Sequence, residues 1–229
     1  MPTYLITGAN RGIGLELTRQ LTARGDRVIG ACRNPAAAKE LKSITDFVST
    51  VDTSSDASIN AMAKRLAGES IDVLINNAGV FLDGAATTSD GTTAEQMLDT
   101  FRTNALGPFL LTRALAPNLE MGDRKLAIQI SSNLGSIAAA QSEGRTGWAA
   151  YSASKAALNM LSVLLNNELR PRGVASVALH PGWVKTDMGG EGADLEREDA
   201  AANIIKTIDG LTPDNHTGFI RYDGEPLSW

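Results

Sequence analysis

A glycine-rich turn near the start of the chain constrains the fold more than any other feature. Residues 7–14, TGANRGIG, follow the apolar segment Tyr4-Leu5-Ile6 and precede a helical pattern through Leu15, Leu17 and Leu21. A strand, a glycine turn and a helix N-terminus together form a phosphate site, because glycine lets the backbone approach a pyrophosphate and unpaired N–H groups favour negative charge. The spacing Gly-x3-Gly-x-Gly differs from the Gly-x-Gly-x2-Gly of most dinucleotide folds. We therefore expect a nucleotide to bind where the first strand ends.

Apolar runs alternate with helical patterns along the whole chain. The expected strands are 3–7, 27–32, 47–51, 71–76, 126–131, 174–180 and 218–222, and helical patterns lie near 13–24, 36–42, 56–68, 93–120, 148–169 and 197–209. Strands that are apolar on both faces and alternate with helices indicate a parallel sheet covered on both sides. The predicted fold class is α/β: a Rossmann-type doubly wound parallel sheet of about seven strands, in a single domain spanning 1–229. Pro108 and Pro117 predict kinks or a break in 93–120.

Composition excludes several classes of protein. With 229 residues, of which 43% are hydrophobic and 21% charged, the chain can bury one substantial core. Its net charge of −5 argues against binding to nucleic acid or to an anionic membrane surface. The single Cys32 excludes an intramolecular disulfide and fits a reducing compartment, and no signal peptide or membrane span is readable, so we expect a cytoplasmic protein. No metal site is readable either.

A second set of motifs lies in the second half of the chain. Tyr151 and Lys155 are four residues apart, which places a phenol and an ammonium on one helix face. Upstream, Ser131-Ser132 ends an apolar strand-like run. With the glycine turn, Asn76-Asn77-Ala78-Gly79 and Pro181-Gly182, these residues make the chain resemble the classical short-chain dehydrogenase/reductase family over nearly its whole length. It looks most like the carbonyl-reductase-like members related to sniffer and bacterial C-factor proteins.

The resemblance implies hydride transfer between a nicotinamide and a carbonyl/alcohol substrate. Tyrosine has an unperturbed pKa of about 10, and a nearby ammonium favours its phenolate, so we expect Lys155 to lower the pKa of Tyr151. By the resemblance, Lys155 also holds the nicotinamide ribose. The resemblance implies that Ser132 donates a hydrogen bond to the substrate oxygen. The family's Ser-Ser-x2-Gly pattern matches this chain from Ser131, and the family uses the second serine. Asn104 matches the helix asparagine whose carbonyl holds a water linking the lysine to solvent.

The family's cofactor positions fall on residues from several segments of the chain. They are Gly8, Asn10, Arg11, Gly12, Ile13, Gly14, Arg33, Asp52, Asn77, Ala78, Gly79, Tyr151, Lys155, Pro181, Gly182, Val184 and Thr186. In NAD-using relatives an acidic residue ends the second strand and binds the ribose 2′-hydroxyl. Here Cys32 stands at that position, followed by Arg33, and Arg11 lies in the glycine turn. Two guanidinium groups without a carboxylate suit a 2′-phosphate, so we expect NADP(H). Asp52 resembles the family's adenine-contacting acid, and Thr186 its carboxamide partner.

The substrate and its surroundings are less defined. Nineteen residues separate Ser132 from Tyr151, more than in typical members, which predicts a small insertion at 136–147 beside a small-molecule carbonyl substrate. Segment 186–199 occupies the place of the family's substrate-covering loop or is a plain surface connection. Candidates for an apolar substrate pocket are Phe81, Leu82, Trp148, Trp183 and Met188. We interpret His180 as a satisfied structural histidine.

Two alternatives to a carbonyl reductase remain open. One is an NADP(H)-binding sensor or signalling protein of the same fold with little turnover, although a pure sensor need not retain Ser132, Tyr151 and Lys155 together. The other is an NAD-linked alcohol dehydrogenase that runs in the oxidative direction. The oligomeric state is open: a homodimer or homotetramer is one reading, since many relatives pair the helices near 93–120 and 148–169, and a monomer is the other, since some carbonyl reductases are monomers blocked by a longer insertion.

Overall fold

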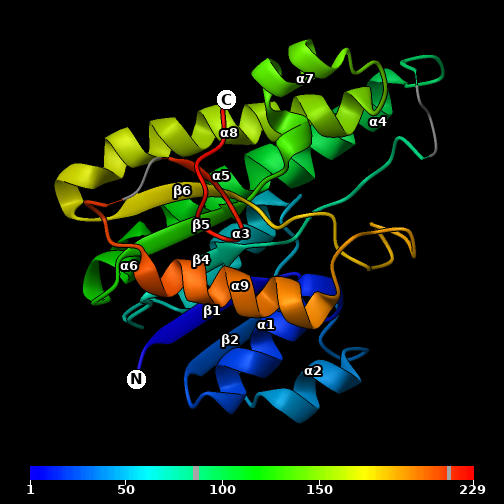
Figure 1. The fold of residues 1–229 in the computed structure, drawn as a ribbon. Helices are drawn as coiled ribbons and strands as arrows, with labels where there is room; N and C mark the ends of the chain where they lie inside the picture. Colours follow the sequence, from blue (N-terminus) through cyan, green and yellow to red (C-terminus); the bar gives the residue numbers. More distant parts are fainter. Residues whose placement is uncertain (85–87, 216–217) are drawn as a thin grey trace.

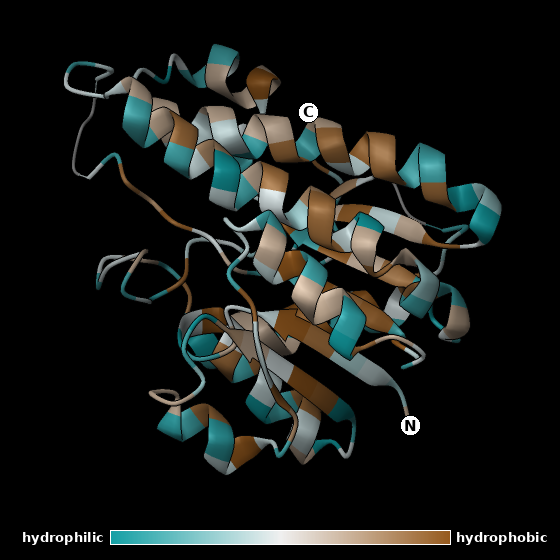
Figure 2. Ribbon diagram, turned by 180° about the vertical axis from the view of Figure 1, so that it is seen from behind, coloured by the Kyte–Doolittle hydropathy of each residue, from teal (hydrophilic) through white to brown (hydrophobic). Residues whose placement is uncertain are grey.

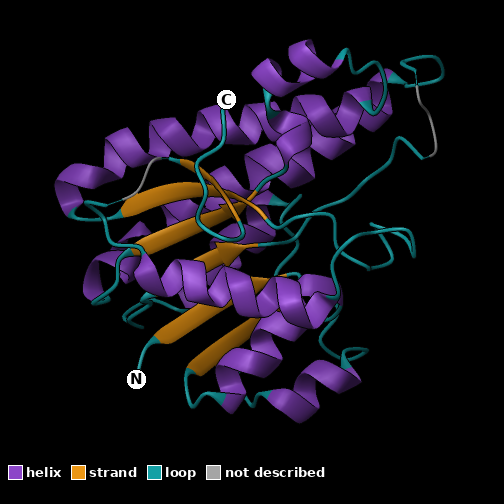
Figure 3. Cartoon of the chain, viewed as in Figure 1, coloured by secondary structure: helices purple, strands orange, loops and turns teal. Residues whose placement is uncertain are grey.

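A seven-stranded parallel sheet forms the centre of the computed structural model, which describes residues 1–84, 88–215 and 218–229 (Figure 3). Its strands are β1 (Thr3–Thr7), β2 (Arg27–Cys32), β3 (Val48–Thr50), β4 (Val73–Asn76), β5 (Leu126–Ile130), β6 (Ala175–His180) and β7 (Phe219–Arg221). They are ordered β3-β2-β1-β4-β5-β6-β7, and each adjacent pair is parallel. The strand order therefore reverses between β1 and β4, and a crevice opens there at the carboxyl ends of the strands. The predicted fold class is confirmed.

Helices cover both faces of this sheet (Figure 1). One face is covered by α1 (Gly12–Ala23), α2 (Lys39–Ile44) and α9 (Arg197–Gly210); the other by α3 (Asp56–Arg65), α5 (Gly107–Ala114), α6 (Ala116–Met121) and α8 (Ala149–Leu169). Successive strand residues point to opposite faces, so that Leu5 and Ile6 of β1 join different apolar clusters. Hydropathy colouring shows the most apolar residues along the strands, between the helical layers (Figure 2). None of the helices in the described residues has the length and apolarity needed to cross a membrane.

The helical pattern at 93–120 is broken into several pieces, as its prolines predict. Pro108 and Pro117 lie in the first turns of α5 and α6, where the missing N–H of proline costs no hydrogen bond. A further break was not predicted: α4 (Ala94–Phe101) runs into a π-helical turn, Arg102–Leu106, before α5. Single π-turns of this kind often occur at functional sites. This one carries Asn104.

Helix α2 and segment 136–147 also differ from the sequence-based prediction. Helix α2 begins at Lys39, later than 36, because hydrogen bonds from Ala37 and Ala38 to Asn34 and Pro35 form turns instead. The segment expected as an insertion, 136–147, contains a short helix, α7 (Ile137–Glu143), which Gly144 ends in a left-handed conformation. Figure 1 places α7 close to the beginning of α8.

Candidate active site

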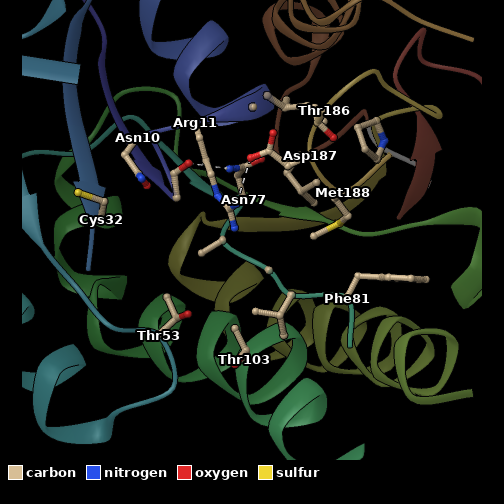
Figure 4. A pocket seen from close by; sticks show the side chains of 18 of the residues that line it. Asn10, Arg11, Cys32, Thr53, Asn77, Phe81, Thr103, Thr186, Asp187 and Met188 are labelled. Atoms are coloured by element: carbon tan, nitrogen blue, oxygen red, sulfur yellow. Dashed lines mark hydrogen bonds and ion pairs between the residues drawn. The ribbon is translucent and has the colours of Figure 1, made fainter. Parts of the chain in front are cut away.

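A cavity of about 460 Å³ lies at the carboxyl ends of the central strands (Figure 4). Its walls come from the glycine turn, the end of β2, the segments after β3, β4 and β6, the π-helical turn and the start of α8. The predicted cofactor residues that line it are Gly8, Asn10, Arg11, Gly12, Ile13, Arg33, Asn77, Ala78, Gly79, Tyr151, Lys155, Pro181 and Thr186. The structure therefore brings together residues that are up to about 180 positions apart in the sequence.

Four predicted cofactor residues are not among the residues that line the cavity. A Cβ on Gly14 would lie 2.5 Å from Nδ2 of Asn77, so Gly14 lets the turn pack against the β4 segment. Gly182 has a φ of +84° and is closely packed against Leu195, and Val184 is buried. Asp52 accepts hydrogen bonds from the backbone N–H and the hydroxyl of Ser54, at 3.0 and 2.7 Å. Its neighbours Val51 and Thr53 line the cavity instead.

The glycine turn is fixed by contacts with the end of β4. The Thr7 hydroxyl accepts hydrogen bonds from the backbone N–H groups of Asn77 and Ala78, at 3.1 and 3.0 Å. The Asn77 side chain donates back to the carbonyl of Thr7 at 3.0 Å. Gly8 has a φ of +66°, and a Cβ there would lie only 3.0 Å from the Cα of Ala78. The turn thus forms a cradle that only glycine fits, open to a ligand on its other side.

Two arginines lie at the rim of the cavity on this side. Arg33 follows the buried Cys32 and is exposed. Arg11 forms an ion pair with Asp187 at 3.2 Å, in which both side chains are mostly exposed, 61% and 81%. Sequence reasoning missed Asp187, although its position directly after Thr186 was a usable signal. An acidic group therefore lies where the resemblance implies an anionic cofactor.

The predicted catalytic side chains meet at the other end of the cavity. Tyr151 lies in the first turn of α8, and Lys155 lies one turn further along. The Lys155 ammonium donates to the carbonyl of Ile130 at 2.7 Å and is 5.5 Å from the centre of the Tyr151 ring. Ser132 follows β5, is nearly buried, and accepts a hydrogen bond from the N–H of Leu134 at 3.1 Å.

Burial controls the charges of this group. It raises the pKa of Tyr151 to about 12, against the smaller lowering effect of a hydrogen bond with Ser132. It lowers the pKa of Lys155 to about 7. The pKa of Tyr151 is therefore raised, and not lowered as its spacing from Lys155 predicts. The physical reason is that desolvation disfavours both the phenolate and the ammonium, so the lysine is not a fixed positive charge.

The two adjacent serines have different surroundings. The Ser131 hydroxyl donates a hydrogen bond of 2.6 Å to the side-chain Oδ1 of Asn159 on α8, which uses its only proton. The Ser132 hydroxyl interacts with Tyr151 and donates only a long hydrogen bond, 3.4 Å, to Oδ1 of Asn133. This difference favours Ser132 as the group that can face a substrate oxygen, although Ser131 and not Ser132 is among the residues that line the cavity.

Asn104 is fully buried in the π-helical turn. Its amide exchanges two hydrogen bonds of 2.8 Å with the backbone of Val80, and it donates to the Ser154 hydroxyl at 3.1 Å. The side chain therefore joins the segment after β4 to α8, while its neighbour Thr103 lines the cavity.

Other predictions about the surroundings had mixed outcomes. Phe81, Leu82 and Met188 line the cavity, whereas Trp183 is 53% exposed and donates to the carbonyl of Gly189. Trp148, also outside the lining, precedes α8.

The prediction that His180 is a satisfied structural histidine is wrong. Within the described residues its buried Nδ1 has no hydrogen-bond partner, and burial lowers its pKa to about 4. The described residues contain no group of three or more His, Cys, Asp or Glu side chains that could hold a metal ion.

The sheet order, the glycine turn and the Ser–Tyr–Lys group define a dinucleotide-binding α/β protein. The family model described as short chain dehydrogenase matches residues 2–196, and the chain belongs to this oxidoreductase family. It is 40% identical to C-signal of Myxococcus xanthus over 171 residues, which are 75% of this chain and all of that protein.

Solved structures agree with this assignment. Carbonyl reductase Sniffer of D. melanogaster is 33% identical, with a TM-score of 0.91 and complete coverage of both chains. NADPH-bound carbonyl reductase from chicken fatty liver is also 33% identical, with a TM-score of 0.89 over 100% of this chain and 99% of that chain.

Proposed function

We propose that this protein is an NADP(H)-dependent oxidoreductase that transfers a hydride between the nicotinamide and a carbonyl/alcohol substrate, with Tyr151 as general acid/base. The observation that carries the proposal is that Tyr151 and Lys155 line one end of a cavity whose other end is the glycine turn, with the Ser132 hydroxyl beside Tyr151. Two structural neighbours are carbonyl reductases, and one of them is bound to NADPH. The family is one of oxidoreductases.

The residues around the cavity fit NADP(H). Gly8 and Gly12, both with positive φ, leave space for a pyrophosphate at the start of α1. Arg11 and Arg33 supply positive charge at the rim for a 2′-phosphate. Lys155 would hold the nicotinamide ribose, and Thr186 the carboxamide. When bound, the cofactor supplies or accepts the hydride.

The protein's own groups then handle the proton. Because burial raises the pKa of Tyr151 to about 12, its hydroxyl is protonated at neutral pH and can donate its proton to the substrate oxygen. Ser132 donates a hydrogen bond to the same oxygen as negative charge develops there. Lys155, with its pKa lowered to about 7, can carry a proton at neutral pH and stabilise the phenolate that Tyr151 leaves behind. A group with a pKa near neutrality is also suited to returning a proton to the phenolate.

The test is turnover of the purified protein with a panel of ketones, aldehydes and quinones, followed by the loss of NADPH absorbance. We expect reduction of several members of the panel, and more efficient reduction with NADPH than with NADH. Tight NADPH binding without turnover of any member would instead favour the sensor or signalling alternative. Higher efficiency with NADH would refute the cofactor assignment.

We further propose that the chain forms a homodimer or homotetramer through α4 and α8. Apolar side chains are exposed on both helices, among them Leu98 at 67% and Met160 at 61%. Sedimentation of the purified protein checks this assembly, and Met160→Glu should shift it toward monomer. A monomeric wild-type protein would contradict it.

A further inference from the structure

Helix α8 begins without a local cap. The residue before it, Trp148, has a φ of +57° and its side chain makes no capping hydrogen bond. The first N–H groups of a helix have no partner within the helix, and helix ends fray when these groups are unsatisfied. Tyr151 is only the third residue of α8, so the phenol belongs to the part of the helix that most needs support.

The missing cap comes from a distant segment of the chain. Oδ1 of Asp83 accepts a hydrogen bond from the N–H of Ala150, and Oδ2 accepts one from the N–H of Tyr151, both at 2.9 Å. Asp83 follows β4 and is 67 and 68 positions away from these residues. Its side chain is nearly buried, at 9% exposure. A carboxylate at this place also interacts favourably with the positive end of the helix dipole.

The same segment contacts Tyr151 directly at one further point and is linked to it indirectly at another. The Phe81 ring meets the Tyr151 ring edge-on, with centroids 5.1 Å apart and an angle of 64°. Val80 is held by Asn104, which donates to Ser154, and the Ser154 hydroxyl donates to the Tyr151 carbonyl at 2.7 Å. Residues 80–83 thus hold the first turn of α8 directly through its N–H groups and the Tyr151 ring, and indirectly through Asn104 and Ser154.

We propose that Asp83 is a positioning residue for Tyr151: its carboxylate fixes the first turn of α8 so that the phenol reaches the substrate oxygen. The part of this inference that concerns turnover rests on the proposed function. Lys155 lies one turn further along and has its own anchor at the carbonyl of Ile130. Loss of the Asp83 carboxylate therefore displaces Tyr151 while Lys155 and the glycine turn keep their positions.

The test compares Asp83→Ala and Asp83→Asn with a matched control, Thr93→Ala. Thr93 caps the neighbouring helix α4 through a hydrogen bond from the N–H of Gln96 at 3.1 Å. In Asp83→Ala we expect kcat to fall roughly 10- to 100-fold, the scale of an error of about 1 Å in catalytic geometry. The Kd for NADPH should stay within about twofold, since a residue outside the cavity lining makes no direct contact to lose. The kcat of Asp83→Asn should lie between those of the wild-type protein and Asp83→Ala. The amide oxygen of asparagine accepts one of the two hydrogen bonds, while its NH₂ group opposes the other.

A second readout needs no turnover. Amide hydrogen exchange at Ala150 and Tyr151 should become faster in Asp83→Ala and stay unchanged in Thr93→Ala. If the wild-type protein reduces no carbonyl but this exchange still accelerates, the proposed function fails and the anchoring role stands. Unchanged exchange in Asp83→Ala overturns the anchoring role, and wild-type kcat in that variant, or an equal loss of kcat and NADPH affinity, overturns the positioning of Tyr151.

Discussion

The two ends of the cavity are built in different ways. At the glycine-turn end, the proposed binding of the cofactor depends on backbone geometry that Thr7 and Asn77 fix. The exposed charges of Arg11 and Arg33 lie at the rim. At the other end, Lys155 is buried and Tyr151 is partly buried, and their pKa values shift in opposite directions. Exposed charges interact weakly and are screened by salt. Salt screens buried charges much less. The first end should therefore tune cofactor choice, and the second should decide whether any reaction occurs.

The largest expected effect is at the buried end. Tyr151→Phe removes the proton donor and keeps the ring that packs against Phe81, so turnover should fall by about two to four orders of magnitude. NADPH affinity should change little, because the glycine turn is untouched. Turnover and cofactor titration of the purified variant check this. Near-normal turnover would mean that the buried end does not carry the proton transfer.

The adjacent serines provide a comparison within the buried end. Ser132→Ala should lower kcat by about 10²–10³, the usual result of removing one donor to a developing oxyanion. Ser131→Ala is the matched control: it breaks the hydrogen bond to Asn159 and should affect stability more than kcat. The two kcat values and the two thermal midpoints decide between the serines. A larger loss of kcat in Ser131→Ala would assign the substrate contact to that residue.

The sequence predicted the parts of this molecule that depend on local patterns. The apolar runs gave the strands, and the glycine turn with the Tyr-x3-Lys spacing located both ends of the cavity, because each motif lies at a strand end or a helix start. Helix α7 and the π-helical turn were missed, since neither has a periodicity of its own that distinguishes it from a loop or an α-helix.

Long-range contacts were outside the reach of such patterns. Asp83 gave no signal as the cap of α8, because a cap is normally sought beside its helix and not 67 positions away. The pKa of Tyr151 was predicted in the wrong direction for a related reason. The sequence shows the spacing between Tyr151 and Lys155. The burial that raises the pKa of Tyr151 depends on packing by residues from the rest of the chain.

Cofactor choice tests the exposed end, with a smaller effect. Each charge-assisted phosphate contact is worth about 1.5–3 kcal/mol, and solvent exposure reduces this value. We therefore expect wild-type protein to prefer NADPH over NADH by roughly 10² in kcat/KM, at about 1.4 kcal/mol per decade. Cys32→Asp combined with Arg33→Ala should reverse the preference, because it adds an acceptor for a ribose hydroxyl and repels a phosphate. The kcat measured with the preferred cofactor should stay close to wild type, and a large loss of it would show that the two ends are not separable.

The smallest effect concerns the ion pair between Arg11 and Asp187. In the structure Asp187 forms an ion pair with the guanidinium that the proposed function assigns to phosphate, and it places a negative charge beside that guanidinium. Asp187→Asn should therefore free Arg11 and strengthen NADPH binding. Exposed ion pairs are worth about 0.2–1 kcal/mol, so the gain in affinity should be only about 1.5- to 5-fold.

Asp194→Asn, in the same segment and also exposed, is the control for the loss of one negative charge. The comparison is made by NADPH titration at low and high salt, and the difference between the two variants should shrink at high salt because the charges are screened. Weaker binding in Asp187→Asn would show that Asp187 orients Arg11 toward the phosphate and does not compete for it.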